Sequence, residues 1–210
     1  MSPWASESQS RAVSNERTTL AAFLAGLSLL EAPSPPVHST AMTTKNYNDI
    51  PREADERTTL TAFLDWQRAT LERKCESLTD EQLHLRSVPP SSLSLLGLMR
   101  HMADVERWWF RINLHGEDLP LQYSSDDDED GDFDNLDDAE VDAVLAAWRA
   151  ECDRSREVVA SYSLDDTGRN RDNGRVMTLR WTLTHMIEEY SRHNGHADLL
   201  RERLDGAVGY

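Results

Sequence analysis

The sequence predicts an all-α fold, built as a helix bundle, on three observations. Apolar residues recur at three-, four- and seven-residue steps along four long stretches, which is the period of amphipathic helices. Alternating strand patterns are almost absent. The 210 residues, 39% of them hydrophobic, are enough for one domain with a sizeable core plus a tail. Four such helices bury their apolar stripes by packing against one another.

The first long helix is predicted to begin at Glu56. Its apolar positions lie among Asp, Arg, Glu and Gln, and they are Leu60, Phe63, Leu64, Leu71 and Leu78. The following segment SLTDEQL offers Thr79 as the N-cap of a short helical turn, because a threonine hydroxyl accepts a hydrogen bond from a backbone N–H of the first turn.

The second long helix is predicted to run from a cap at Ser92 or Ser94 to about His115. The preceding prolines in VPPSSLS break any earlier helix, because proline lacks a backbone N–H. The apolar side of this helix consists of Leu95, Leu98, Met102, Val105, Trp109 and Ile112. The aromatic run Trp108 to Phe110 fits core packing better than a substrate platform, although Trp109, two turns beyond His101, is placed to wall a pocket.

The third and fourth long helices follow an Asp-rich loop from Gly116 to Asp137. The third is predicted from Asp138 to Tyr162, and its stripe consists of Val141, Val144, Leu145, Trp148, Cys152 and Val158. Asp137 and Asp138 suit the positive end of its dipole. The fourth begins near Thr178, ends at about Leu204, and carries Trp181, Leu183, Met186, Ile187, Leu199 and Leu200.

The formal charge of -16, from 38 acidic and 22 basic residues, argues against partners that are recognised through phosphate. We therefore expect no nucleic acid and no membrane among the partners. Cys75 and Cys152 lie too far apart in sequence for a redox or zinc pair, and we expect two free thiols in a reducing compartment. This favours a cytoplasmic location.

The N-terminal stretch TTLAAFLAGLSLL, from Thr18 to Leu30, has the length of a signal-peptide apolar region. Acidic residues cancel the arginines before it, and it is too short to span a bilayer. NERTTLAAFL in this part also echoes DERTTLTAFL at 55–64. We expect residues 1–41 to be a disordered N-terminal extension, residues 42–55 to be a linker, and residues 56–206 to be the bundle.

Histidines and acids that suit a metal gather at two places: His101, and the segment HMIEEYSRHNGH that begins at His185. Residues three and four apart lie on one helix face, so Glu189 and His193 point the same way. If a second helix brings His101 opposite this face, two imidazoles and one carboxylate make a three-ligand, open-sided metal site. His196, one turn beyond His193, is an alternative ligand or an acid–base group beside the metal.

Structural readings of the same residues stay open. His101 by itself fits a hydrogen-bonded core histidine, and His185 fits a supporting or solvent-facing position. An inward-facing Glu189 needs a cation, and an arginine serves as well as a metal. The arginines that suit this pairing are Arg100, Arg180 and Arg192.

The Asp-rich segment carries a second metal pattern. Residues 126–137 of SSDDDEDGDFDNLDD place acids and a glycine at the spacing of a calcium loop. Asp137 is shorter than the glutamate that usually ends such a loop, and so acidic a run fits many patterns. The alternative is a solvated acidic loop near the mouth of a pocket.

Four segments together resemble the DinB-like superfamily, in particular an actinobacterial branch close to the mini-circle protein and to mycothiol-dependent maleylpyruvate isomerase. They are ADERTTLTAFLDWQRATL, LTDEQL, SLLGLMRHMADVERWWF and WTLTHMIEEYSRHNGHADLLRERLDG. The resemblance covers about residues 50–206. It implies an up-and-down four-helix bundle whose core holds a divalent metal.

The resemblance also implies which residues bind that metal. One ligand comes from the second helix and two from the last, which carries the roles onto His101, Glu189 and His193. Many DinB-like proteins have histidine where Glu189 stands, and a glutamate there is typical of the isomerase branch. Zinc is the first candidate for the ion, and nickel, iron or manganese also suit these ligands.

Three functions follow as expectations. The first is a metal-dependent thiol S-transferase or isomerase, with mycothiol as cosubstrate, an electrophile as second substrate, and His196 as the catalytic acid–base group. The second is a non-catalytic metal-binding or stress-response bundle. The third is a metal-free interaction module. Because helix bundles often pair through exposed stripes, a homodimer is also expected.

Overall fold

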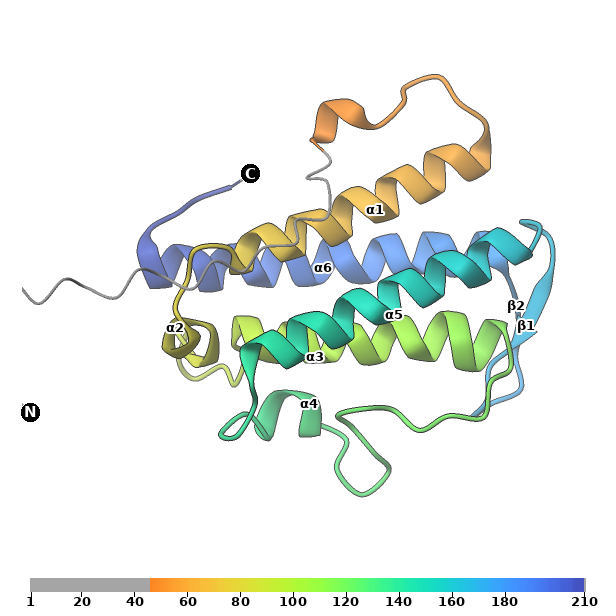
Figure 1. The fold of residues 1–210 in the computed structure, drawn as a ribbon. Helices are drawn as coiled ribbons and strands as arrows, with labels where there is room; N and C mark the ends of the chain where they lie inside the picture. Colours follow the sequence, from red (N-terminus) through yellow and green to blue (C-terminus); the bar gives the residue numbers. More distant parts are fainter. Residues whose placement is uncertain (1–45, 210) are drawn as a thin grey trace, which may run out of the picture. The chain divides into compact units, whose positions relative to one another are not determined.

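The computed structural model describes residues 46–209, and within them the chain is mostly helical with one small two-stranded sheet (Figure 1). This confirms the all-α prediction in its general form. The extension predicted at 1–41 lies outside the described residues. The linker predicted at 42–55 is described from residue 46 and contains one 3-10 turn, η1, at Tyr47–Asp49.

The first two helices begin at side-chain caps. Helix α1 spans Glu56–Cys75, and the carboxylate of Asp55 accepts a hydrogen bond from the backbone N–H of Thr58. Helix α2 spans Asp80–His84 and begins at the predicted cap, Thr79. There the Thr79 hydroxyl accepts from the Gln82 backbone N–H, and the Gln82 side chain accepts in return, a reciprocal capping box.

The predicted second long helix is two helices in the structure. Helix α3 spans Leu95–Glu106, and Ser94, one of the two predicted caps, accepts from the backbone N–H of Gly97. A π-helix, η2, continues at Arg107–Leu114. Sequence periodicity does not reveal this change, because the wider turn keeps an apolar side. Such turns are often found at functional sites.

The predicted third helix begins later than expected. A short helix, α4, occupies Gly131–Asp134 in the Asp-rich segment, and α5 spans Val141–Ser161. Between them the chain turns at Leu136, which is buried. The acids at 137 and 138 therefore precede α5, which begins after Glu140 without a side-chain cap.

A β-hairpin that the sequence did not predict connects α5 to the last helix. Strands β1, Thr167–Arg169, and β2, Val176–Thr178, pair antiparallel with Gly168 opposite Met177. A Cβ at Gly168 would lie 2.4 Å from the Asn113 carbonyl oxygen, so glycine lets β1 approach η2 closely. Helix α6 then spans Leu179–Asp205, begins near Thr178 as predicted, is capped by that residue, and ends at Gly206 in the left-handed region.

The long helices pack side by side around one apolar core, with α1 along α6, and α3 along both α5 and α6 (Figure 1). The largest fully buried side chains include Leu64, Leu71, Leu95, Leu98, Met102, Phe110, Trp148 and Tyr190. Cys75 and Cys152 are buried free thiols, as predicted.

The core also encloses a charged network. Arg68 donates to both carboxylate oxygens of Glu106, each at 2.7 Å. The Tyr190 hydroxyl donates to Glu106 Oε1 at 2.7 Å, and Trp148 Nε1 donates to the Tyr190 oxygen at 3.0 Å. Hydrogen bonds of this kind make the burial of a carboxylate tolerable.

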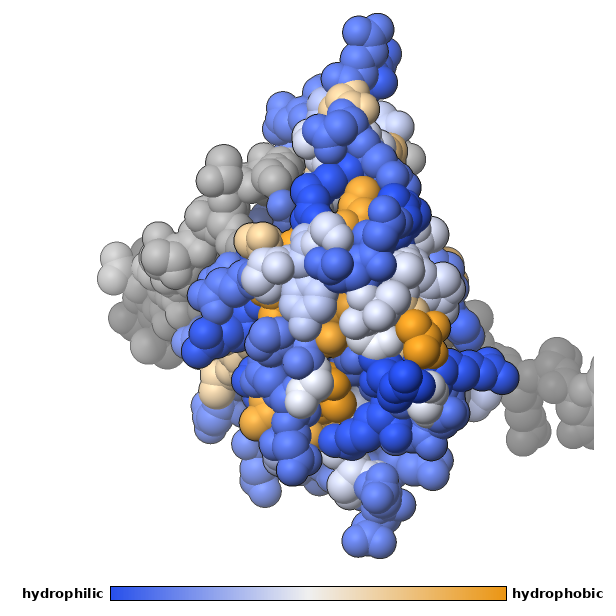
Figure 2. All heavy atoms as spheres, turned by 90° about the vertical axis from the view of Figure 1, so that its right-hand side faces the viewer, coloured by the Kyte–Doolittle hydropathy of each residue, from blue (hydrophilic) through white to orange (hydrophobic). Residues whose placement is uncertain are grey.

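The end of the molecule that carries the hairpin has a mostly hydrophilic surface with small, separate apolar groups (Figure 2). Trp181 and Leu199, which the sequence placed on the apolar side of the last helix, are exposed. None of the described helices is long and apolar enough to cross a membrane.

Candidate metal centre

The structure brings His101 and His193 together, although they lie 92 positions apart in the sequence. His101 lies on α3 and His193 on the neighbouring α6, and their ring centroids are 4.7 Å apart. His193 is buried, and His101 is partly exposed. Two imidazole rings from two helices therefore lie next to each other, as the predicted metal site requires.

Glu189 lies one helical turn before His193. Its Oε2 is 3.6 Å from His193 Nε2, and its Oε1 is 3.3 Å from His185 Nε2. Two ligand atoms of one tetrahedral ion lie about 3.4 Å apart for bond lengths of about 2.1 Å. The spacing between Glu189 and His193 thus suits a shared ion, while the second oxygen of Glu189 faces His185.

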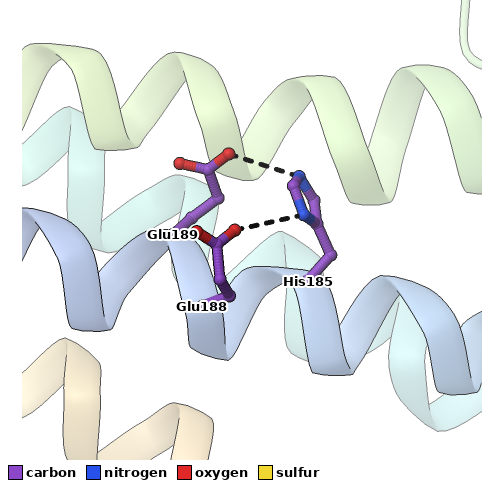
Figure 3. A group of neighbouring side chains, drawn as sticks. All are labelled: His185, Glu188 and Glu189. Carbon is purple, nitrogen blue, oxygen red and sulfur yellow. Dashed lines mark ion pairs between the residues drawn. The ribbon is translucent and has the colours of Figure 1, made fainter.

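A different trio gathers most closely in the described part of the chain. There, only His185, Glu188 and Glu189 bring one ligand atom each to within 4.8 Å of one another (Figure 3). The set of His101, Glu189 and His193 does not meet this measure. The ligand atoms of the predicted triad therefore do not all lie this close together, and the triad stays a prediction.

The geometry of the His185 trio suits ion pairing better than metal binding. Its Nδ1 lies 3.5 Å from Glu188, and its Nε2 lies 3.3 Å from Glu189, so the two carboxylates face different nitrogens of one ring (Figure 3). A metal bound at one ring nitrogen lies in the ring plane on that side, away from the other carboxylate. Glu188 is also exposed. His185 therefore lies beside Glu189, although its buried Nε2 makes no hydrogen bond.

Aromatic rings hold His185 in turn. Trp181 stacks on it at a centroid distance of 4.9 Å and an interplanar angle of 17°, and Trp109 meets it edge-on at 4.5 Å. Trp109 therefore packs against His185. It does not line the cleft beside His101, where its position two turns beyond His101 would have allowed it to wall a pocket. Trp108 lines that cleft instead.

His193 is electronically suited to bind a metal. Burial, with smaller contributions from the nearby His101 and His196, lowers the pKa of His193 to about 3. The ring is then neutral at physiological pH, and neutral imidazole is the form that binds metals. Its Nδ1 is buried and has no hydrogen-bond partner.

His196 lies on the same helix, with its ring centroid 5.4 Å from that of His193. Its Nδ1 is also buried without a partner. His196 thus lies beside His193, where an acid–base group would be expected.

The arginine alternative for Glu189 finds little support. Arg100 lies over the ring of Tyr123 at 4.6 Å, and Arg180 pairs with Glu56 and Asp165. Of the three arginines considered, these two have other partners. Among the ion pairs of the described residues, Glu189 is paired with histidines alone.

Sequence reasoning missed the role of Asp132. The sequence pattern places Asp132 at a position of the calcium loop. In the structure, its Oδ2 lies 2.7 Å from His101 Nδ1. Asp128 accepts a hydrogen bond from Asn135, and Gly131–Asp134 is helical. Two of the carboxylates at calcium-loop positions, Asp128 and Asp132, thus have other partners. No local sequence signal links Asp132 to His101, because the contact depends on how α4 folds back onto α3.

A cleft of about 490 Å³ opens beside His101 and Asp132. This volume suits a small organic ligand. Val105 and Trp108 line it along the same helical side, and the guanidinium of Arg171 covers the Trp108 ring at 4.9 Å. The Arg171 backbone N–H donates to the Asn113 side chain at 2.7 Å, which holds the hairpin loop against η2.

Fold and site together define a helical protein with a histidine and carboxylate cluster beside a ligand-sized cleft. A family model described as mycothiol-S-transferase matches residues 59–206, from α1 through α6. The chain belongs to this family, which is a DinB-like family related to mycothiol enzymes. No curated protein gives a significant match.

Proposed function

We propose that this protein is a metal-dependent mycothiol S-transferase. In this proposal the four long helices form the up-and-down four-helix bundle of DinB-like proteins, and His101, Glu189 and His193 hold a divalent ion, with zinc the first candidate. The observation that carries the proposal is the approach of His101 and His193 from two helices, with Glu189 Oε2 3.6 Å from His193 Nε2. Family membership supports the transferase activity.

A bound divalent ion lowers the pKa of a thiol, so that the reactive thiolate forms at neutral pH. Residues of the chain position the ligands, bind the substrates and accept the proton. Glu189 lies beside His185, and His101 contacts Asp132 at 2.7 Å. The adjoining cleft takes the substrates, and His196 accepts the thiol proton on its ring. The sulfur then forms a bond to the electrophilic carbon while the bond from that carbon to its leaving group breaks, and the leaving group departs with the bonding electrons.

Metal analysis tests the metal site directly. We expect about one divalent ion per chain in the wild type, and its loss in His101→Ala and in His193→Ala, because each removes a ligand. His115→Ala is the matched control, since His115 is exposed and its ring contacts Tyr162, away from His101 and His193. A wild-type protein without metal would contradict the proposal.

Turnover separates a transferase from a metal-binding protein without activity. We expect consumption of mycothiol with a model electrophile, such as a chlorinated nitrobenzene, and loss of this activity with a chelator. His196→Ala should retain metal and lose most of the rate, because general acid–base groups contribute about 10²–10⁴-fold. Metal binding with no thiol consumption would leave a binding protein and overturn the catalytic proposal.

A further inference from the structure

Helix α4 holds the His101 ring from two sides. Asp132 Oδ2 lies 2.7 Å from Nδ1, and the ring of Phe133 stacks on the imidazole at 4.9 Å with an interplanar angle of 28°. Gly97 makes room for this contact, because a Cβ there would lie 3.2 Å from Phe133 Cδ1. Adjacent residues of one short helix thus control the position and the rotation of His101.

The contact with Asp132 also determines which nitrogen of His101 carries the proton. A carboxylate oxygen accepts hydrogen bonds, so Nδ1 must be the donor. The lone pair then lies on Nε2, which is the nitrogen left to bind a ligand. Histidines that bind metals usually donate their other ring N–H to a carboxylate or carbonyl in this way.

Contacts around α4 fix the positions of Asp132 and Phe133 beside His101. Arg86 donates to the Phe133 carbonyl oxygen at 3.1 Å, and Arg100 donates to the carbonyl oxygen of Asn135. At the start of α4, a Cβ on Gly131 would lie 2.6 Å from the Tyr123 carbonyl oxygen, so the helix is pressed closely against the preceding loop. Asp132 and Phe133 therefore lie on a packed helix rather than on a solvated loop.

Asp132 is buried at considerable cost. It is 4% exposed, and its Oδ1 has no hydrogen-bond partner. Burial of a carboxylate oxygen without a partner destabilises the folded state. Asp132 also lines the cleft beside His101. A carboxylate in this position is easier to explain by function than by stability.

We infer that Asp132 is a positioning residue for the metal ligand His101, and that the Asp-rich segment serves to place the Asp132 carboxylate beside the His101 ring. The inference rests on the proposed metal site. The carboxylate holds His101 with Nδ1 protonated and Nε2 available, and Phe133 keeps the ring from rotating. The segment that carries a calcium-like pattern thus acts on the metal centre indirectly, through one hydrogen bond.

The test measures zinc affinity by competition with a chelating dye. We expect Asp132→Ala to bind zinc about 10–100-fold more weakly than the wild type, the usual effect of removing such a partner. Asp132→Asn should lose less, because its amide oxygen can still accept from Nδ1. Asp127→Asn, in the same segment and exposed, is the control and should match the wild type.

A second measurement reports on the ring itself. Long-range proton–nitrogen NMR spectra of the metal-free protein should show His101 protonated at Nδ1 in the wild type, and a shifted tautomer equilibrium in Asp132→Ala. Circular dichroism checks that each variant folds. Wild-type affinity and an unchanged tautomer in a folded Asp132→Ala would overturn the inference. Absence of zinc binding by the wild type would instead overturn the proposed function.

Discussion

At the scale of single residues, Glu106 is a buried charged group with several partners, outside the proposed metal centre. It is fully buried at the end of α3, and Arg68, Tyr190 and Cys152 surround it. The pair of Arg68 and Glu106 crosses the core between α1 and α3, close to the point where η2 begins. It joins α1 to α3, while α1 packs mainly along α6.

Removing one partner of this pair should be costly. We expect Arg68→Met to lower the free energy of unfolding by about 3–5 kcal/mol, because it leaves an uncompensated carboxylate in the core. Urea unfolding measures this change. Arg154→Met removes an exposed ion pair with Glu157 and should cost less than about 1 kcal/mol. Equal effects of the two substitutions would show that the buried pair has no special role.

The same glutamate makes stability depend on pH. Burial by itself would raise the pKa of Glu106, but the charge of Arg68 and hydrogen bonds from Arg68 and Tyr190 outweigh it and hold the pKa below the ordinary 4.5. The folded protein therefore binds this proton less readily than the unfolded chain does. The stabilisation is present above that ordinary value and is lost as the pH falls through the lower, folded-state pKa.

Unfolding experiments between about pH 6 and pH 3 check this dependence. We expect the free energy of unfolding of the wild type to fall with decreasing pH more steeply than that of Glu106→Gln, which has no carboxylate to protonate at this position. Parallel curves for the two proteins would contradict the assignment to Glu106.

Sequence reasoning named the residues that approach one another but not those that support them. Helical spacing placed Glu189 and His193 on one face, and the family resemblance supplied His101 as their partner. Asp132 and the contact between His185 and Glu189 depend on how α4 folds back and on which oxygen of a carboxylate faces which ring. Neither follows from spacing along one helix.

At the scale of elements, hydrogen-bonding caps were the most predictable features. Thr79 and Ser94 cap helices where the sequence placed them, because the cap depends on residues within one turn. The π-helix η2 and the hairpin depend on tertiary contacts, such as that of Gly168 with Asn113, and were not predicted. The third helix began later than expected because buried Leu136 belongs to a preceding turn.

Two glycines allow a direct test of these local contacts. Gly195 lies on the exposed side of α6, and a Cβ there would meet nothing within 4 Å. We expect Gly195→Ala to stabilise the protein by up to about 1 kcal/mol, since alanine favours the helix. Gly168→Ala should destabilise it, because the new methyl group would collide with η2. Thermal unfolding measures both, and a loss of stability in Gly195→Ala would contradict the open position of this residue.

At the scale of the whole molecule, a metal ion between α3 and α6 would tie together two helices that are distant in the sequence. A ligand that binds the folded state alone stabilises it by mass action. At a free zinc concentration of about 100 times Kd, we expect a gain of about 2.7 kcal/mol. For a domain of this size, the melting temperature should rise by about 5–10 °C.

Calorimetry with and without zinc measures this shift. His193→Ala should show almost none of it, while His115→Ala should behave as the wild type does. An equal shift in His193→Ala would mean that zinc stabilises the protein from another place, such as the exposed acids of the 126–137 segment.

The central claim is that one divalent ion binds between His101 and His193 with Glu189 as the third ligand. The most direct measurement is a crystal structure of the metal-loaded protein with anomalous diffraction at the metal edge. The proposal predicts a single strong peak within bonding distance of His101, His193 and Glu189. A peak that bound His185 and Glu188 instead, or no peak in the described part of the chain, would contradict it.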